Sequence, residues 1–153
     1  MKQKQVWRYW CEFCNKAGLQ KHHIAQHEAH CTLNPHRECR VCKMVQDLPE
    51  GGTIERRDPV ALAAMLPDPA SYTECDENVQ TFTWVSERIR EPLAVAMAHV
   101  RKACDGCPAC ILAALRLRGI PVPMADHIFN FTAEMKSIWN DINDSRADEM
   151  DRY

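Results

Sequence analysis

The chain has 153 residues, of which 46% are hydrophobic and 26% charged, so a packed core is feasible and global disorder is excluded. Its 5 glycines and few alternating β-branched runs argue against a β-sandwich or barrel. The net charge of -2 is unevenly divided, because residues 1–45 carry +5 and residues 46–153 carry -7, which predicts a basic N-terminal module and an acidic body with separate roles.

The first ten residues, MKQKQVWRYW, lack the apolar segment of a secretory signal, and no later apolar stretch reaches the length of a membrane span. We therefore expect a cytoplasmic protein without a membrane partner. The chain has 9 cysteines. Clustered thiols in a reducing compartment indicate metal or redox chemistry more often than disulfides.

Residues 1–45 contain the first cluster of cysteines and histidines. Cys11 and Cys14 form a CxxC pair, His27 follows after twelve residues, and Cys31 after three more. A CxxC knuckle directs two thiolates at one ion, and residues i and i+4 of a helix share a face, so these four side chains can bind one metal ion. The segment from Tyr9 to Cys31 resembles a ββα zinc finger of the two-Cys/two-His type, with cysteine in place of the second histidine.

The resemblance implies a hairpin followed by a helix. Tyr9 stands where such a finger has an aromatic residue, and Ile24 stands where it has its core leucine. The pattern departs at Gly18, where the usual core aromatic is missing and the neighbouring Leu19 is the residue that would compensate.

The spacing leaves alternatives to this ligand set open. His30 can replace His27, or the segment binds no metal. A ribbon-like site would instead use two CxxC pairs, Cys11, Cys14, Cys39 and Cys42. Zinc is favoured over iron or copper, because mixed thiolate and imidazole ligands in tetrahedral spacing suit it best. With all four ligands from the protein, the site is expected to be structural rather than catalytic.

The finger resemblance also implies a surface that reads nucleic acid. Lys21 becomes the first helical residue, and the positions that face base edges fall on Gln20, His23 and Gln26. Gln can pair with adenine and His with a purine acceptor, so duplex DNA is the expected partner. The alternative is an ordinary solvated helix face. One finger contacts only about three base pairs, so specific affinity would need a homodimer or another contact.

Residues 46–57 are expected to form a linker, residues 58–143 a helical body and residues 144–153 a polar tail. Asp58 and Pro59 are typical of a helix start, and Pro67 of a helix stop. Asp105-Gly106 predicts a turn, Pro108 a first helical turn, and Gly119 a helix end. The segment GIPVPM, 119–124, is expected to be extended, because residues before proline avoid helix.

Two apolar stripes with spacings of three and four predict further helices in the body. Pro92 lies inside the first stripe, where it either kinks one long helix or begins a second. The stripe residues are Val79, Phe82, Val85, Ile89, Leu93, Met97 and Val100, and then Phe131, Met135, Ile138 and Ile142.

The remaining cysteines have several interpretations. A second zinc site would join two CxxC pairs and attach the module to the body, with ligands Cys39, Cys42, Cys107 and Cys110. CPAC at a helix start is also typical of thioredoxin-like redox motifs, but no apolar strand precedes it. An iron–sulfur cluster would use Cys104, Cys107, Cys110 and a remote Cys75. For Cys75 and Cys104, plain packed thiols are favoured.

Together these features predict a small α-rich α+β protein, with a ββα-like zinc-binding module followed by a helical body and one or two zinc ions. The expected function is nucleic-acid binding in a regulatory or accessory role. The alternative is a zinc-stapled adaptor or inhibitor of another protein. No catalytic motif is evident, so an enzyme such as a metal-dependent nuclease is not expected. The body is weakly similar in style to short uncharacterised phage and prophage proteins, which implies a phage origin and a host or phage protein as the adaptor's target.

Overall fold

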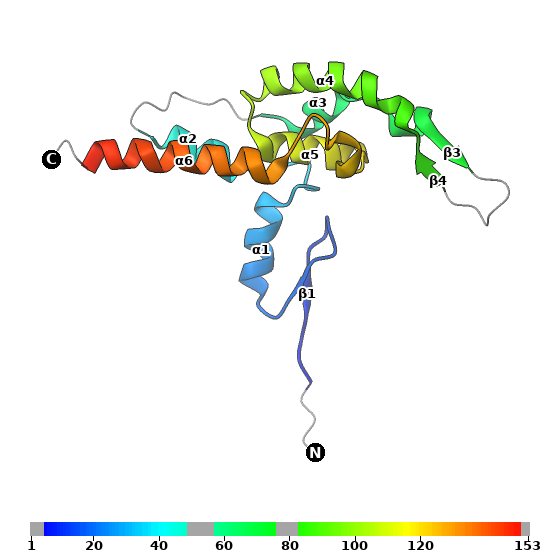
Figure 1. The fold of residues 1–153 in the computed structure, drawn as a ribbon. Coiled ribbons are helices and arrows are strands. Elements are labelled where there is room, and N and C mark those ends of the chain that lie inside the picture. The colour runs from blue at the N-terminus through cyan, green and yellow to red at the C-terminus, as the bar shows by residue number, and fades with distance from the viewer. Residues whose placement is uncertain (1–4, 49–56, 76–82, 151–153) are drawn as a thin grey trace.

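The computed structural model describes residues 5–48, 57–75 and 83–150. A hairpin and a helix near the N-terminus project from a layer of helices, and a second hairpin lies at one end of that layer (Figure 1). This arrangement confirms the predicted α-rich fold class. The strands and α-helices in chain order are β1 (Tyr9–Trp10), β2 (Ala17–Gly18), α1 (Lys21–His30), α2 (Arg40–Gln46), α3 (Pro59–Ala64), β3 (Thr73–Cys75), β4 (Thr83–Val85), α4 (Arg90–Ala103), α5 (Pro108–Arg118) and α6 (Phe131–Met150).

The projecting unit, residues 7–31, is called the finger below. Its strands β1 and β2 pair antiparallel, with Tyr9 opposite Gly18 and Trp10 opposite Ala17. Asn15 lies in the connecting turn with φ of 58°, a left-handed conformation that Asn tolerates better than most residues. Helix α1 follows directly, so the predicted hairpin–helix order is present.

Helix α2 packs with the body rather than with the finger. Its Val41 is buried in the main hydrophobic core, and Cys39 and Cys42 pack against the same core. The boundary predicted between residues 45 and 46 therefore falls inside α2, which ends at Gln46. The finger has a separate small core.

Helix α3 begins and ends where the sequence predicts. The Asp58 carboxylate accepts a hydrogen bond from the Val60 backbone N–H at 2.9 Å, and Pro59 occupies the first helical position. The helix ends at Ala64, ahead of Pro67. A 3-10 turn, η1 (Pro69–Tyr72), then leads into β3.

The helix predicted from residue 79 onward is wrong in its first part. Val79 and Phe82 lie outside the described residues, but Val85 belongs to β4, which pairs antiparallel with β3. The β-branched and aromatic residues of β4 favour a strand, and the partner strand satisfies its backbone groups. A 3-10 turn, η2 (Glu87–Ile89), separates β4 from α4. Pro92 lies in the first turn of α4, where its missing N–H has no helical partner to lose.

Helices α4 and α5 meet at a tight turn that the sequence predicts. Asp105 and Gly106 have φ of 45° and 68°, Pro108 begins α5, and Gly119 ends it in the left-handed conformation with φ of 78°. The next segment differs from the prediction of extended chain, because Val122–Ala125 forms a 3-10 turn, η3. Proline's fixed φ is compatible with such a turn, and the Met124 N–H donates to the Pro121 carbonyl.

Helix α6 continues past residue 143, the predicted end of the body, to Met150. Residues 143–147 are exposed, so the polar segment is a solvated helical extension. The same helix buries Ile142 and packs Phe131, Met135 and Ile138 against the main core, as their spacing predicts.

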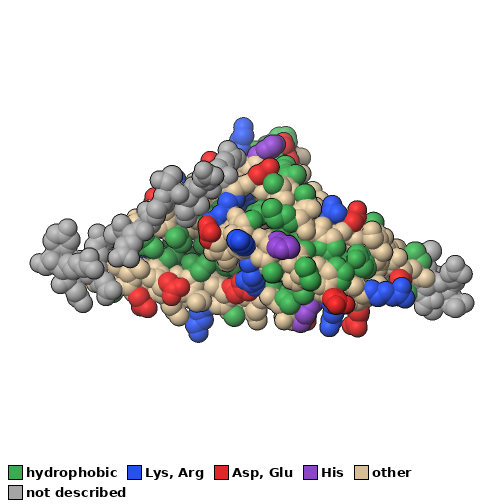
Figure 2. Space-filling view, turned by 90° about the horizontal axis from the view of Figure 1, so that it is seen from above, with side chains coloured by type: hydrophobic (Ala, Val, Ile, Leu, Met, Phe, Trp, Pro, Cys, Tyr) green, Lys and Arg blue, Asp and Glu red, His purple; other side chains and the backbone are tan. Residues whose placement is uncertain are grey.

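The main core lies between α3, α4 and α5, and its largest fully buried side chains include Ile89, Leu93, Met97, Ile111 and Leu115. Figure 2 shows the molecule from above relative to Figure 1. On this face, hydrophobic side chains are interspersed with charged side chains of both signs. Among the described residues, no helix combines the length and apolar character needed to cross a membrane.

Candidate metal centres

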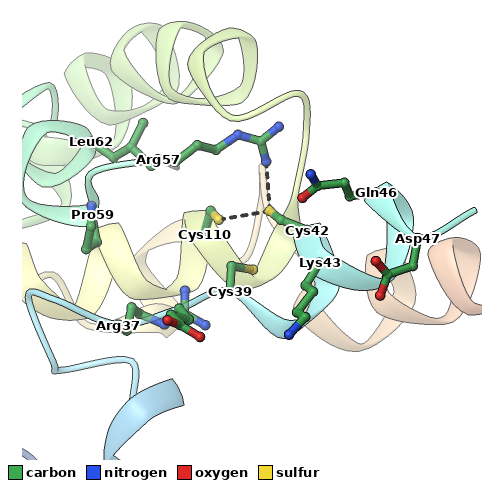
Figure 3. Close-up of a pocket in the computed structure, with 11 residues that line it drawn as sticks. Arg37, Cys39, Cys42, Lys43, Gln46, Asp47, Arg57, Pro59, Leu62 and Cys110 are labelled. Carbon is green, nitrogen blue, oxygen red and sulfur yellow. Dashed lines mark hydrogen bonds between the residues drawn. The ribbon is translucent and has the colours of Figure 1, made fainter. Parts of the chain in front are cut away.

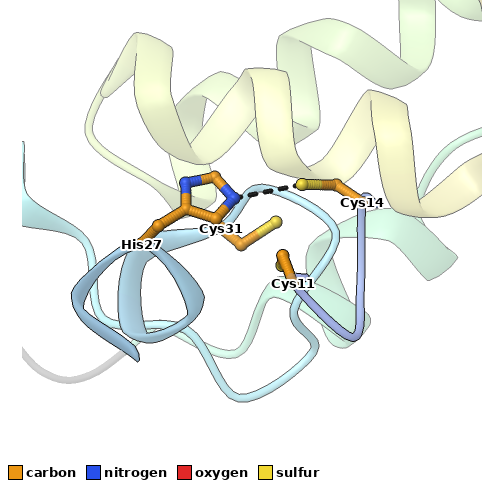
Figure 4. Close-up of side chains that lie close together, drawn as sticks. All are labelled: Cys11, Cys14, His27 and Cys31. Atoms are coloured by element: carbon orange, nitrogen blue, oxygen red, sulfur yellow. Dashed lines mark hydrogen bonds between the residues drawn. The ribbon is translucent and has the colours of Figure 1, made fainter. Parts of the chain in front are cut away.

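The first candidate centre lies in the finger, where four side chains from the hairpin and α1 converge (Figure 4). Their ligand atoms all lie within 4.8 Å of one another, and Cys14 Sγ is 3.0 Å from His27 Nε2. Tetrahedral zinc with Zn–S bonds of about 2.3 Å and Zn–N bonds of about 2.0 Å separates its ligand atoms by roughly 3.5–3.8 Å. A zinc ion therefore fits this group with small side-chain shifts. Its members are Cys11, Cys14, His27 and Cys31.

The hairpin turn positions the first two ligands. The Cys11 N–H donates to the Lys16 carbonyl at 2.8 Å, and the Asn15 N–H donates to the Cys11 carbonyl at 3.2 Å. The Glu12 N–H donates to a carboxylate oxygen of Glu28 at 3.0 Å, which ties the turn to α1. These bonds bring the CxxC knuckle against His27 of α1 and against Cys31, which directly follows the helix with non-helical backbone angles.

The core beneath this centre differs from the one that the finger resemblance implies. Ile24 is buried as expected, and a Cβ at Gly18 would lie only 3.0 Å from its Cδ1, so glycine leaves room for this side chain. Leu19 is 62% exposed and does not compensate for the missing aromatic. Instead Phe13 and Leu33 pack against the buried residues.

His30 does not join the first centre. Its Nδ1 lies 2.9 Å from the Glu38 carbonyl, and a carbonyl can only accept, so this nitrogen donates the hydrogen bond. The ring thus helps to hold the chain after α1. His27 is the histidine within reach of the three cysteines.

The thiols of the first centre differ in acidity. For Cys14, burial opposes ionisation, but hydrogen bonds to the His27 ring and the Lys16 backbone lower its pKa to about 7. Burial raises the pKa of Cys31 to about 11. Metal binding at neutral pH must therefore displace a proton from Cys31.

The second candidate centre joins α2 to α5. The Sγ atoms of Cys39 and Cys107 are 3.7 Å apart, and those of Cys42 and Cys110 are 3.6 Å apart. These distances are far longer than a disulfide bond of about 2.05 Å. They match the roughly 3.8 Å edge of a zinc tetrahedron with four thiolates. All four sulfur atoms lie within 4.8 Å of one another.

Two short segments supply these thiols. Cys39 immediately precedes α2 and Cys42 lies in its first turn, while Cys107 precedes α5 and Cys110 lies in that helix. Contact with the Cys107 thiol lowers the pKa of both Cys39 and Cys110. The ribbon-like alternative is therefore not formed, because the second CxxC pair meets the third rather than the first.

A cavity of about 380 Å³ lies beside the second centre (Figure 3). Its lining includes Cys39, Cys42 and Cys110, and the Arg57 guanidinium reaches Cys42 across it. The sequence offered no signal for Arg57, because it lies 15 residues from Cys42 along the chain in the predicted linker.

The donor sets fit single ions of soft or borderline character. Three thiolates with one imidazole in tetrahedral spacing suit zinc, and four thiolates suit zinc or iron. A cluster of several metal ions needs its cysteines farther apart than a single ion does, so the compact second group favours one ion. Both groups supply four protein ligands, which is typical of structural sites.

Two arginines connect the finger to the helical body. Arg37 is only 6% exposed, and its guanidinium donates to the His30 carbonyl at 3.4 Å and to the Ala109 carbonyl at 3.1 Å. Arg116 of α5 donates to the Thr32 hydroxyl at 2.7 Å. The Ala109 carbonyl lies beside Cys110, so the finger is attached next to the second centre.

The residues predicted to contact nucleic acid all lie on the finger and are exposed: Gln20, Lys21, His23 and Gln26. Gln20 immediately precedes α1, and the other three lie in that helix. Arg8 and Lys16 on the hairpin are exposed as well. The hairpin also exposes Trp7 and Trp10.

The remaining two cysteines lie outside both groups. Cys75 is exposed at the end of β3. Cys104 is buried in the main core, and burial raises its pKa to about 11. The structure therefore does not gather the four cysteines of the iron–sulfur alternative.

Comparisons of the whole chain with protein-family models, curated proteins and solved structures find no match.

Proposed function

We propose that this protein binds nucleic acid through its finger, with zinc in the first centre holding the finger folded and zinc in the second holding it on the body. The observation that most favours this proposal is that the finger projects from the helical layer (Figure 1). Most side chains of α1 are exposed to solvent there. Gln20, His23 and Gln26 offer hydrogen-bonding side chains long enough to reach base edges in a major groove. Neither centre is assigned a catalytic role, because protein ligands fill all four positions.

Charge supports the same proposal. Arg8, Lys16 and Lys21 are exposed on the finger, where they can lie against phosphates. Three such contacts predict a salt slope of about -2.7, so raising salt fourfold weakens binding about 40-fold. A single finger covers only about three base pairs, and we propose that two copies of the chain bind together on a specific site.

The test is fluorescence anisotropy with a labelled random-sequence duplex, using zinc-loaded and chelated protein at about 50 and about 200 mM salt. We expect binding that needs zinc and falls about 40-fold between the two salts. The variant Gln20→Ala/His23→Ala/Gln26→Ala should weaken binding to a selected duplex at least tenfold, on the scale of ~1–3 kcal/mol for each good base contact.

The matched control is Lys136→Ala/Asn140→Ala, which removes exposed polar side chains from α6. It should bind as the unmodified chain does. Absence of binding at the lower salt would refute the proposal, as would equal loss in the control variant.

A protein partner is the second candidate function, because the finger exposes large apolar side chains. Trp7 is 86% exposed and Trp10 is 59% exposed. Indole rings at such positions are typical of interface anchors. An adaptor would form a stoichiometric complex that tolerates salt and weakens on Trp10→Ala, whereas Gln20→Ala/His23→Ala/Gln26→Ala would leave the complex intact.

A further inference from the structure

Arg57 makes a contact that the two ligand sets do not include. Its Nη1 donates to Cys42 Sγ at 3.0 Å (Figure 3). Its Nη2 pairs with the Asp105 carboxylate in the turn before α5. The Arg57 side chain is only 11% exposed, whereas that of Asp105 is 82% exposed. The Arg57 guanidinium is therefore held against the Cys42 sulfur, and it pairs with the Asp105 carboxylate on its solvent-exposed side.

Electrostatics gives this contact a role in metal binding. A divalent ion held by four thiolates carries a net charge of minus two, and withdrawing that charge from water is costly. A guanidinium beside one thiolate offsets part of the charge, and its N–H···S contact is a charge-assisted hydrogen bond. Groups outside the ligand set that orient a ligand in this way commonly change metal affinity by 10–100-fold.

Arg57 also stands at a structural junction. It directly precedes Asp58, the N-cap of α3. Helix α3 packs against α5 and buries Leu62 in the main core. Through its two contacts, Arg57 connects the start of α3 to α2 and to the turn that leads into α5. A metal that fixes Cys42 therefore fixes the start of α3 as well.

We propose that Arg57 is a positioning residue of the second centre, which tightens metal binding at Cys42 and couples occupancy of that centre to the docking of α3. This inference rests on metal occupancy of the second centre and is independent of nucleic-acid binding. By linkage, whatever stabilises the docked α3 also strengthens metal binding.

The first experiment is a cobalt(II) titration, competed with zinc, of the full chain. Thiolate-to-cobalt absorption grows with the number of thiolates, so it reports the two centres differently. Repeating the titration in the Cys14→Ser background isolates the second centre. We expect Arg57→Ala to weaken the second centre 10–100-fold and to leave the first unchanged. Arg57→Lys, which keeps the charge, should recover part of the loss.

The matched control is Arg88→Ala, which removes an arginine whose side chain is 82% exposed and is paired with Glu74, a residue of neither ligand set. Its metal affinities should equal those of the unmodified chain. The proposal is overturned if Arg57→Ala keeps its helical circular dichroism and binds metal at the second centre within twofold of the unmodified chain. It is also overturned if Cys107→Ser leaves the metal stoichiometry unchanged.

Hydrogen exchange supplies a readout that affinity alone does not. Zinc should slow amide exchange in α3 of the unmodified chain, and this effect should be largely lost in Arg57→Ala at saturating zinc. Equal zinc protection of α3 in both proteins would refute the coupling. Because no nucleic acid is present in either experiment, failure here removes only the role proposed for zinc in the second centre and leaves nucleic-acid binding by the finger standing. Failure of DNA binding in turn leaves the role of Arg57 standing.

Discussion

Replacing Cys14 by Ser should unfold the finger and leave the body folded. The finger core contains three buried residues, of which two are ligands and one is Ile24. Burying one Ile side chain contributes about 1.5–3 kcal/mol. Zinc binding to short finger peptides contributes about 10–16 kcal/mol. The free energy of zinc binding is several times larger than that of burying Ile24, so the finger should unfold when one ligand is lost.

The size of the spectral change follows from helix lengths. α1 has 10 residues, whereas α4, α5 and α6 have 14, 11 and 20. Losing α1 alone should therefore remove less than a fifth of the helical signal in far-UV circular dichroism. Hydrogen exchange should show that α1 has lost its protection while α4 and α5 keep theirs.

The control for this experiment is Cys75→Ser, because Cys75 is exposed and belongs to neither group. It should leave both the spectrum and the metal content unchanged. If Cys14→Ser removed most of the helical signal, the view that the body folds around its own core would be refuted. If α1 stayed protected in Cys14→Ser, the metal would not be what stabilises the finger.

Three further outcomes are expected. Cys107→Ser should reduce the metal content from two ions to one by native mass spectrometry, and retention of two ions would exclude the second centre. Gly18→Ala places a Cβ 3.0 Å from Ile24 Cδ1, so it should destabilise the finger by about 1 kcal/mol and weaken zinc binding there severalfold in a competition titration. Zinc affinity of the first centre should rise with pH up to about 11, because the Cys31 thiol must lose its proton to bind; affinity independent of pH would exclude Cys31 as a ligand.

Local signals in the sequence predicted the pieces that depend on local geometry. The CxxC pairs, the helical spacing of His27 and Cys31, the Asp58-Pro59 helix start and the Gly119 helix end each involve atoms within a few residues. The β3–β4 hairpin was missed, because Val85 also fits the apolar spacing of a helix. Pairing with β3 decided between the two structures at that point.

Spacing along the chain is enough to predict that Cys11, Cys14, His27 and Cys31 can share one ion, since a knuckle and one helical turn set those distances. It left open which thiols Cys39 and Cys42 would meet, and only the packing of α2 against α5 decided that, across 68 residues of chain. Packing of α3 against α5 places Arg57, which precedes α3, beside Cys42. Arg37 is buried where it bonds the Ala109 carbonyl of α5. Contacts between distant segments follow from how whole helices fill a common core, and the spacing of residues along one segment does not encode them.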